Sequence, residues 1–217
     1  MKNSQIGRSM IEMIGVLAVI GVLSVGGLAG YTKAMMQYRA NRTVEQIMEI
    51  ASRISLIGEQ TSSYEGLSNN VAIKMKAVPG DMITAGSTDL EGMFEGDVTI
   101  GASNLLSGTS DSDDNSKNLA FTITYTGLSS ADCLRMAAQE WKSGNNGSLI
   151  GVGFAAQESV KSTVADNLYL GCTTNAVSSG TSSYVIGCAD ELPLPADKAM
   201  VGCNCTGNTC VMVVKYY

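Results

Sequence analysis

Few residues of this 217-residue chain have types that support catalysis. It has 20 acidic side chains and six cysteines but no histidine. The cysteines are Cys133, Cys172, Cys188, Cys203, Cys205 and Cys210. Without histidine the chain lacks Ser-His-Asp and Cys-His nucleophilic systems, the commonest metal ligand and the usual general base at neutral pH. We therefore expect a protein that is not an enzyme and that holds no cofactor or metal.

One further residue, Glu12, is chemically notable because it stands just before 20 consecutive uncharged residues, 13–32. A helix of 20 residues is about 30 Å long, which matches the hydrocarbon thickness of a bilayer. A carboxylate at the edge of such a segment is costly when unpaired and is usually functional or paired. The alternative is an interfacial carboxylate that stabilises the N-terminus of the helix.

The elements that must position Glu12 and the cysteines differ in composition. Residues 8–60 hold five basic and four acidic residues, whereas residues 61–217 hold eight basic and 16 acidic residues and all the cysteines. The net charge of -6 argues against a nucleic-acid binder, whose affinity comes mostly from cations on phosphates. The sequence thus predicts an apolar N-terminal element joined to an acidic body, with no nucleic-acid partner.

The apolar run continues into an amphipathic helical pattern. Val44, Ile47, Met48, Ala51 and Ile54 recur at helical spacing on one face. The pattern predicts one long helix over residues 9–57, which Gly58 ends. Its first half would face lipid and its second half would pack on a globular head. Lys2 and Arg8 before the apolar run favour a cytoplasmic N-terminus, while the alternatives are a removed secretory signal or a simple membrane anchor.

The N-terminal pattern of Gly7, four further residues, Glu12 and a long apolar helix resembles the class III signal of type IV prepilins and pseudopilins. The resemblance implies that prepilin peptidase cuts after Gly7 and methylates the new N-terminal residue, Arg8. It also implies that Glu12 meets the N-terminal ammonium of a neighbouring subunit in the filament core. Arg8 departs from the usual phenylalanine, methionine or leucine.

The resemblance also implies a domain organisation: a leader over residues 1–7, a helix over 8–57 and a head over 58–217. Within the helix, residues 8–32 would form the membrane and filament-core part, and residues 33–57 the amphipathic part. The kinking proline common in the family is absent. Gly21, Gly26, Gly27 and Gly30 could supply local helix weakness instead, since each glycine costs about 1 kcal/mol in a helix, or they could permit close helix packing.

The body has strand patterns at five places, which are residues 97–100, 119–126, 149–154, 183–187 and 210–217. A capping-box-like start at residues 129–132 predicts a helix with Leu134, Ala137, Ala138 and Trp141 on one face, stopped by Gly144. Helices covering one face of an antiparallel sheet are the economical arrangement. The expected fold class is α+β, a type IV pilin fold with a long N-terminal helix packed on an antiparallel-sheet head that contains disulfides.

The even number of cysteines in an acidic body beyond a membrane segment predicts an oxidised, extracytoplasmic domain. Zinc on Cys203, Cys205 and Cys210 is disfavoured because histidine and paired Cys-x-x-Cys knuckles are absent. Six cysteines allow 15 connectivities. The preferred set is Cys133–Cys203, Cys172–Cys188 and Cys205–Cys210.

The body itself resembles type IVb pilins, particularly the bundle-forming pilins, at residues 60–67, 128–137 and 194–197. The long-range disulfide of that family, which bounds its variable D-region, maps onto Cys133–Cys203. The other four cysteines and the short leader depart from the family.

Two further motifs are better explained by ordinary structure. Residues 151–156, Gly-Val-Gly-Phe-Ala-Ala, lack the βαβ context of a dinucleotide site and fit a buried strand. Residues 111–116 have calcium-loop spacing, but Ser116 and Thr122 replace the turn glycine and the closing glutamate, which favours a solvated acidic loop.

The expected function is that of a structural subunit of a type IVb-like pilus, made for adhesion, aggregation or conjugation. The alternatives are a minor pilin or type II secretion pseudopilin and, from another class, a membrane-anchored extracytoplasmic binding protein or enzyme. The expected partners are further copies of the chain in a helical filament, prepilin peptidase, the inner-membrane assembly machinery, and host or neighbouring-cell surfaces. The prepilin would span the inner membrane once, with its head in the periplasm, before it joins the extracellular pilus.

Overall fold

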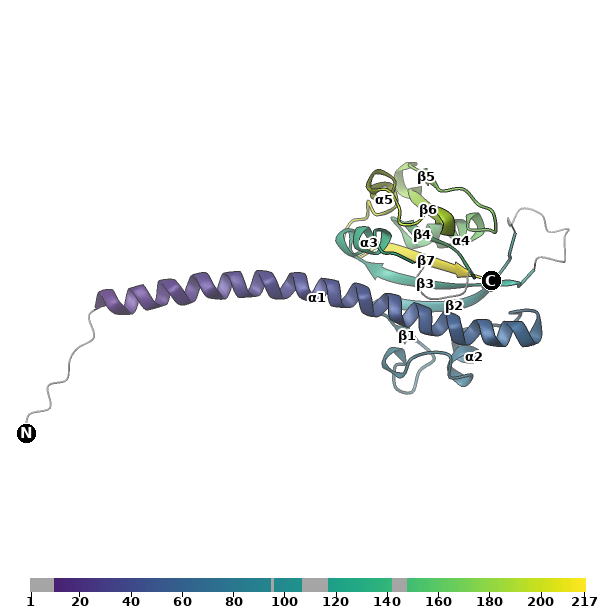
Figure 1. Cartoon of the computed structure of the whole chain (residues 1–217), viewed down its shortest axis with the longest axis horizontal. Helices are drawn as coiled ribbons and strands as arrows, with labels where there is room; N and C mark the ends of the chain where they lie inside the picture. The colour runs from purple at the N-terminus through teal and green to yellow at the C-terminus, as the bar shows by residue number, and fades with distance from the viewer. Residues whose placement is uncertain (1–9, 95, 107–116, 142–147) are drawn as a thin grey trace, which may run out of the picture. The chain divides into compact units, whose positions relative to one another are not determined.

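The computed structural model describes residues 10–94, 96–106, 117–141 and 148–217. The chain divides into two compact units, Met1–Arg39 and Ala40–Tyr217. Helix α1, Met10–Thr61, runs through both units without interruption. Of the first unit the structure describes only this helix. The second unit contains the rest of α1 and every other helix and strand of the described residues (Figure 1).

The long helix ends later than its glycine predicts. Gly58 lies inside α1, which continues to Thr61. The backbone turns at Ser62, whose φ of 56° is left-handed and whose N–H donates to the Gly58 carbonyl at 2.8 Å. This is the usual left-handed helix cap, built on serine instead of glycine. Gly58 is needed for another reason, because a Cβ there would collide with the ring of Tyr64.

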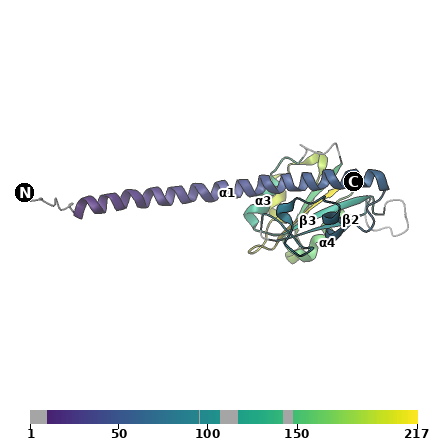
Figure 2. The ribbon, with the colours of Figure 1, turned by 90° about the horizontal axis from the view of Figure 1, so that it is seen from below.

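The second half of α1 lies across one face of the sheet (Figure 2) and buries an apolar stripe there. Ile47, Ala51 and Ile54 of the predicted stripe are fully buried, and Ile50 joins them. Val44 packs against this core but is only partly buried. The helical periodicity therefore identified most of the packed face, but it missed Ile50 and included Met48, which is only half-buried and outside the core.

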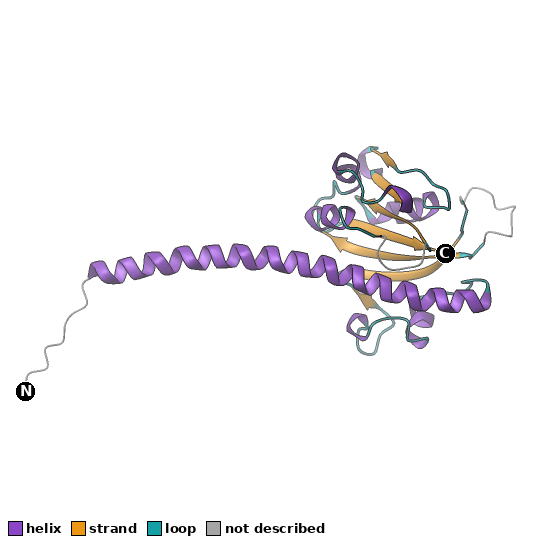
Figure 3. Cartoon of the chain, viewed as in Figure 1, coloured by secondary structure: helices purple, strands orange, loops and turns teal. Residues whose placement is uncertain are grey.

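The described residues of the head form one seven-stranded sheet, ordered β1-β2-β3-β7-β4-β6-β5, in which every neighbouring pair is antiparallel (Figure 3). The strands are β1 (Leu90–Glu91), β2 (Asp97–Ser103), β3 (Ala120–Leu128), β4 (Leu149–Ala155), β5 (Asn175–Val177), β6 (Tyr184–Cys188) and β7 (Cys210–Tyr216). The α+β class is confirmed, as are the five predicted strands, each within a few residues of its expected bounds.

Both faces of the sheet are covered, so the expectation that helices cover one face is wrong. On β7, Met212 and Val214 belong to the core that contains the buried stripe of α1. Val211 and Val213 point to the other face, into a smaller core with Val164 of α4 (Lys161–Asn167). Because β7 is central and packed on both sides, all seven of its residues are buried.

The glycines of residues 151–156 belong to β4, a fully buried strand as the sequence predicts. A Cβ on Gly153 would collide with Val164, and one on Gly151 with the Gly187 carbonyl. These glycines therefore let α4 and the neighbouring strand β6 approach closely, which is a packing role.

Three further helices lie around the sheet: α2 (Asn69–Lys74), α3 (Ser130–Ala137) and α5 (Ala196–Gly202). The predicted cap of α3 is present, since the Ser129 hydroxyl accepts a hydrogen bond from the Asp132 N–H at 3.2 Å. The helix is shorter than predicted and ends at Ala137. Trp141 lies beyond its end, where the indole N–H donates to the Met136 carbonyl at 3.1 Å and satisfies an end of the helix. Gly144, the predicted stop, lies outside the described residues.

Candidate functional site

The first half of α1 exposes apolar side chains along the whole described N-terminal segment. Val22 is 75% exposed and Val25 is 72% exposed. Among the described residues, α1 is the one helix that is long and apolar enough to cross a membrane, and none of its most apolar window, with a mean hydropathy of 2.2, is buried. A contiguous apolar surface of this size marks a site of contact with lipid or protein.

Glu12 lies in the first turn of this helix. A carboxylate is favourable there because the N-terminal end of a helix carries partial positive charge. Gly7 and Arg8, the two predicted processing residues, lie outside the described residues. The roles of Gly7, Arg8 and Glu12 in processing and assembly therefore stay predictions.

The glycines at 21, 26 and 27 lie within the uninterrupted helix. A Cβ added at any of them, or at Gly30, would meet nothing within 4 Å. Among the described residues, no contact therefore requires glycine at these positions. Their predicted role, whether helix flexibility or close packing of neighbouring helices, remains a prediction.

The six cysteines form three disulfides, with none left free. The pairs are Cys133–Cys203, Cys172–Cys188 and Cys205–Cys210, the set preferred from the sequence. The first pair joins α3 to the residue that follows α5, across 70 positions of sequence. The Ser130 hydroxyl donates to the Cys203 carbonyl at 2.6 Å beside it. The described residues contain no group of three or more side chains that could hold a metal ion. The acidic loop at residues 111–116 lies outside them.

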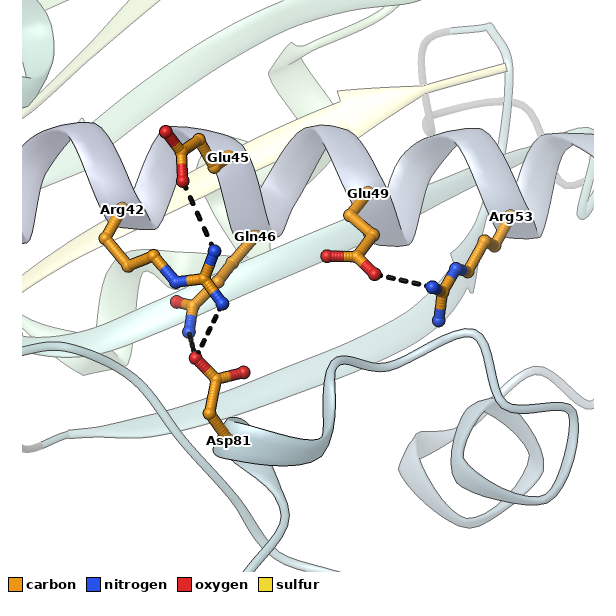
Figure 4. Close-up of polar contacts among 6 residues, drawn as sticks. All are labelled: Arg42, Glu45, Gln46, Glu49, Arg53 and Asp81. Atoms are coloured by element: carbon orange, nitrogen blue, oxygen red, sulfur yellow. Dashed lines mark hydrogen bonds and ion pairs between the residues drawn. The ribbon is translucent and has the colours of Figure 1, made fainter.

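A polar cluster that no sequence pattern predicts joins the turn at residues 79–82 to α1 (Figure 4). Arg42 of α1 donates to Asp81 at 2.8 Å and to Glu45 at 3.2 Å, and Gln46 donates to the same Asp81 oxygen at 3.2 Å. The hydrogen bond from Arg42 holds the pKa of Asp81 below its usual value. No local sequence pattern predicts this cluster, because Arg42 and Asp81 lie 39 positions apart in the sequence.

Lys215 of β7 is a buried charged side chain that the sequence does not predict, and it is only 1% exposed. Its ammonium donates to the Ala165 carbonyl in α4 at 3.0 Å. Burial lowers the pKa of Lys215 to about 8, and the nearby charge of Asp166 partly opposes this shift. The sequence around Lys215 does not indicate that this lysine lies on a central strand that is buried on both faces.

This buried lysine predicts a pH-dependent stability. Between the folded pKa of about 8 and the unfolded value of 10.5, the unfolded chain binds more protons, so the free energy of unfolding rises with pH in that window. From pH 7 to about pH 9.5, the wild type should gain about 2 kcal/mol relative to Lys215→Met. Urea denaturation of both proteins at the two pH values measures this difference. Parallel pH profiles for the two proteins would contradict it.

Comparison with known proteins places this chain in a family. Residues 37–185 match the family described as PilS N terminal. This match covers more than half of the chain. The chain belongs to the PilS N-terminal family. The match spans the second half of α1 and the sheet as far as β6.

Two relatives of this PilS-family chain are each named "Major structural subunit of bundle-forming pilus", one from Escherichia coli O127:H6 (strain E2348/69 / EPEC) and one from Escherichia coli O111:H-. Each is 23% identical over 136 residues, which cover 63% of this chain and 65% of the relative's length. A solved type IV b pilin from Salmonella typhi is similar with a TM-score of 0.47 and 16% identity, over 81% of this chain and 98% of that one. The family match and the two bundle-forming pilus relatives confirm the resemblance to type IV pilins.

Proposed function

We propose that this chain is a structural subunit of a type IVb-like pilus. Prepilin peptidase would cut after Gly7, and the mature chain would polymerise through its N-terminal helix into an extracellular filament. The observation that carries the proposal is the pairing of a wholly exposed apolar helix segment with a folded head that buries one face of the rest of the same helix. The PilS family match supports the same conclusion.

The physical chemistry of the exposed segment explains why it would have two environments. Before assembly, the inner membrane would solvate the apolar side chains of residues 13–31, with the head in the periplasm. In a filament, the same side chains would pack against helices of neighbouring subunits, so that protein contacts replace lipid contacts. The three glycines at 21, 26 and 27 would allow those helices to approach closely.

Glu12 would give the helix bundle a preferred axial register. A carboxylate in a dry core is costly unless it is paired. The N-terminal ammonium of a neighbouring mature subunit supplies the opposite charge. Arg8 adds a second cation at that end. Assembly at the register that neutralises the carboxylate would therefore be favoured over other registers.

The partners would be further copies of the chain, prepilin peptidase and the inner-membrane assembly machinery. The acidic head would form the outer surface, where it would meet a host or neighbouring cell in adhesion, aggregation or conjugation. The alternatives are a minor pilin or pseudopilin and an anchored extracytoplasmic protein. Both relatives are named as major pilus subunits, which favours a major subunit.

Shearing of surface filaments from cells that express the chain tests this proposal. The chain should be the dominant protein of the sheared fraction, and that fraction should be absent from a strain in which its gene is deleted. A minor pilin would be present in trace amount, with filaments made of another protein. An anchored protein would stay with the membranes and leave no sheared filament.

A further inference from the structure

Helices α2 and α5 lie near opposite edges of the sheet in the head. Helix α2 packs beside β2, next to the edge strand β1, while α5 packs beside β5 and β6 at the other edge (Figure 1). The two helices therefore present separate surfaces of one head, here called the α2 edge and the α5 edge. The α2 edge consists of the end of α1 and residues 62–76, and the α5 edge consists of residues 189–202.

The α2 edge has an apolar cavity of about 230 Å³ between the end of α1 and α2. Its apolar lining includes Ile54, Ile57, Leu67, Val71 and Met75. Met75 is 47% exposed at this cavity, and it stands between two exposed lysines, Lys74 and Lys76. The α2 edge thus combines an open apolar cavity with positive charge on its border. Glu65 also lines the cavity and Glu59 is exposed at the end of α1, so the positive charge of the α2 edge is confined to Lys74 and Lys76 beside Met75.

The α5 edge has the complementary character. Met200 is 62% exposed on α5, although the neighbouring Ala199 is buried. Asp197 is exposed three residues earlier, so both side chains lie on the same face of the helix. Glu191 is also exposed. Lys198, the only cation of this segment, donates to the Thr174 carbonyl at 3.2 Å. The segment 189–202 has a net charge of two negative.

We propose that the α5 edge of one copy of this chain docks on the α2 edge of the next copy, with Met200 in the apolar cavity and Asp197 near Lys74 and Lys76. Methionine suits this contact because its flexible thioether adapts to irregular apolar cavities. The opposite charges of Asp197 on one edge and of Lys74 and Lys76 on the other favour this pairing over edges of the same kind. The inference rests on the proposed filament and names the head surfaces that join its subunits.

The use of two different surfaces decides the kind of assembly. A contact between unlike surfaces leaves one free surface of each type at the two ends, so copies can be added without limit unless a ring closes. A symmetric contact would instead consume its own surface and stop at a dimer. The two edges therefore supply the head contact that an open filament needs in addition to its helix contacts.

Photo-crosslinking in assembled filaments tests the contact directly. The full-length chain with Met75→benzoylphenylalanine is assembled, sheared, irradiated and digested, and mass spectrometry then maps the crosslinked peptides. We expect a crosslink to the peptide that contains Met200. Because the two edges lie apart in one head, this crosslink must join two copies. Crosslinks to other parts of the head, or none in filaments that form normally, would overturn the inference but not the proposed function. Failure of the wild type to form filaments would overturn the proposed function itself.

A charge exchange gives a second, independent test. We expect Asp197→Lys to lower the yield of sheared filaments about tenfold, and its combination with Lys74→Glu or Lys76→Glu to restore most of that yield. The matched control exchanges the Glu158–Lys161 ion pair on the other face of the sheet, at 2.6 Å, and should leave the yield unchanged. Thermal unfolding of each variant checks that its head remains folded. A folded Asp197→Lys variant with wild-type yield, or one that neither lysine exchange rescues, would contradict the contact.

Discussion

Replacement of both Cys133 and Cys203 by serine is expected to lower the free energy of unfolding of the head by about 4 kcal/mol. The two cysteines lie 70 positions apart in sequence, with their Cα atoms 5.5 Å apart in the fold. By the chain-entropy account, the disulfide restricts the unfolded chain in proportion to the logarithm of this loop length. Its loss also leaves α3 and the end of α5 joined only by packing and by hydrogen bonds such as that from Ser130. We therefore expect few filaments from this variant.

The matched control removes the short-range disulfide by changing Cys205 and Cys210 to serine. These residues are five positions apart, so the same account gives a loss of about 2 kcal/mol. Urea denaturation of the wild type and both variants measures the difference. Equal losses for the long and the short loop would contradict the entropic explanation. A free, readily alkylated Cys133 thiol in the wild type would contradict the pairing itself.

The second large effect is expected from Glu12→Val. The variant should insert in the membrane at least as well as the wild type, because it loses a charge at the edge of the apolar segment. Its yield of sheared filaments should fall by about tenfold or more, since the N-terminal ammonium of the neighbouring subunit would remain unpaired in the filament core. Membrane fractionation and quantification of the sheared protein separate these two steps.

The control for this variant is Glu45→Gln, which removes an exposed carboxylate from the same helix, away from both proposed docking edges. It should insert and assemble like the wild type. A normal filament yield from Glu12→Val would contradict the proposed pairing of Glu12 with the N-terminal ammonium of a neighbouring subunit. Poor membrane insertion of Glu12→Val would instead show that the carboxylate acts before assembly.

Long, regular patterns in the sequence predicted the fold well. The apolar and amphipathic periods of α1 extend over 52 residues, so neither its existence nor its buried face depended on single residues. Strand β3 and the cap of α3 also have local signals in the alternation of residues 119–126 and in Ser129. Helices α2, α4 and α5 are six or seven residues long, which is too short for a helical period to be recognised. The same holds for the two- and three-residue strands β1 and β5.

The other features that the sequence did not predict depend on contacts between segments that lie far apart in the sequence. Central β7 is the last strand of the chain, and its burial on both faces depends on α4, which the sequence did not reveal. The burial of Lys215 follows from that packing. The contact of Arg42 with Asp81 likewise depends on a turn that folds back on α1. At the predicted site, the three cysteine pairs are those preferred from the sequence. The roles of Gly7, Arg8 and Glu12 stay predictions.

The central claim is that this chain is a prepilin whose mature form builds a filament. The mass of its N-terminal peptide, measured in the sheared fraction and in membranes with and without prepilin peptidase, tests this claim most directly. The account predicts that the chain begins at Arg8 when the peptidase is present and at Met1 when it is absent. An intact Met1 in the presence of the peptidase, or a cut beyond the apolar segment at residue 32, would contradict it.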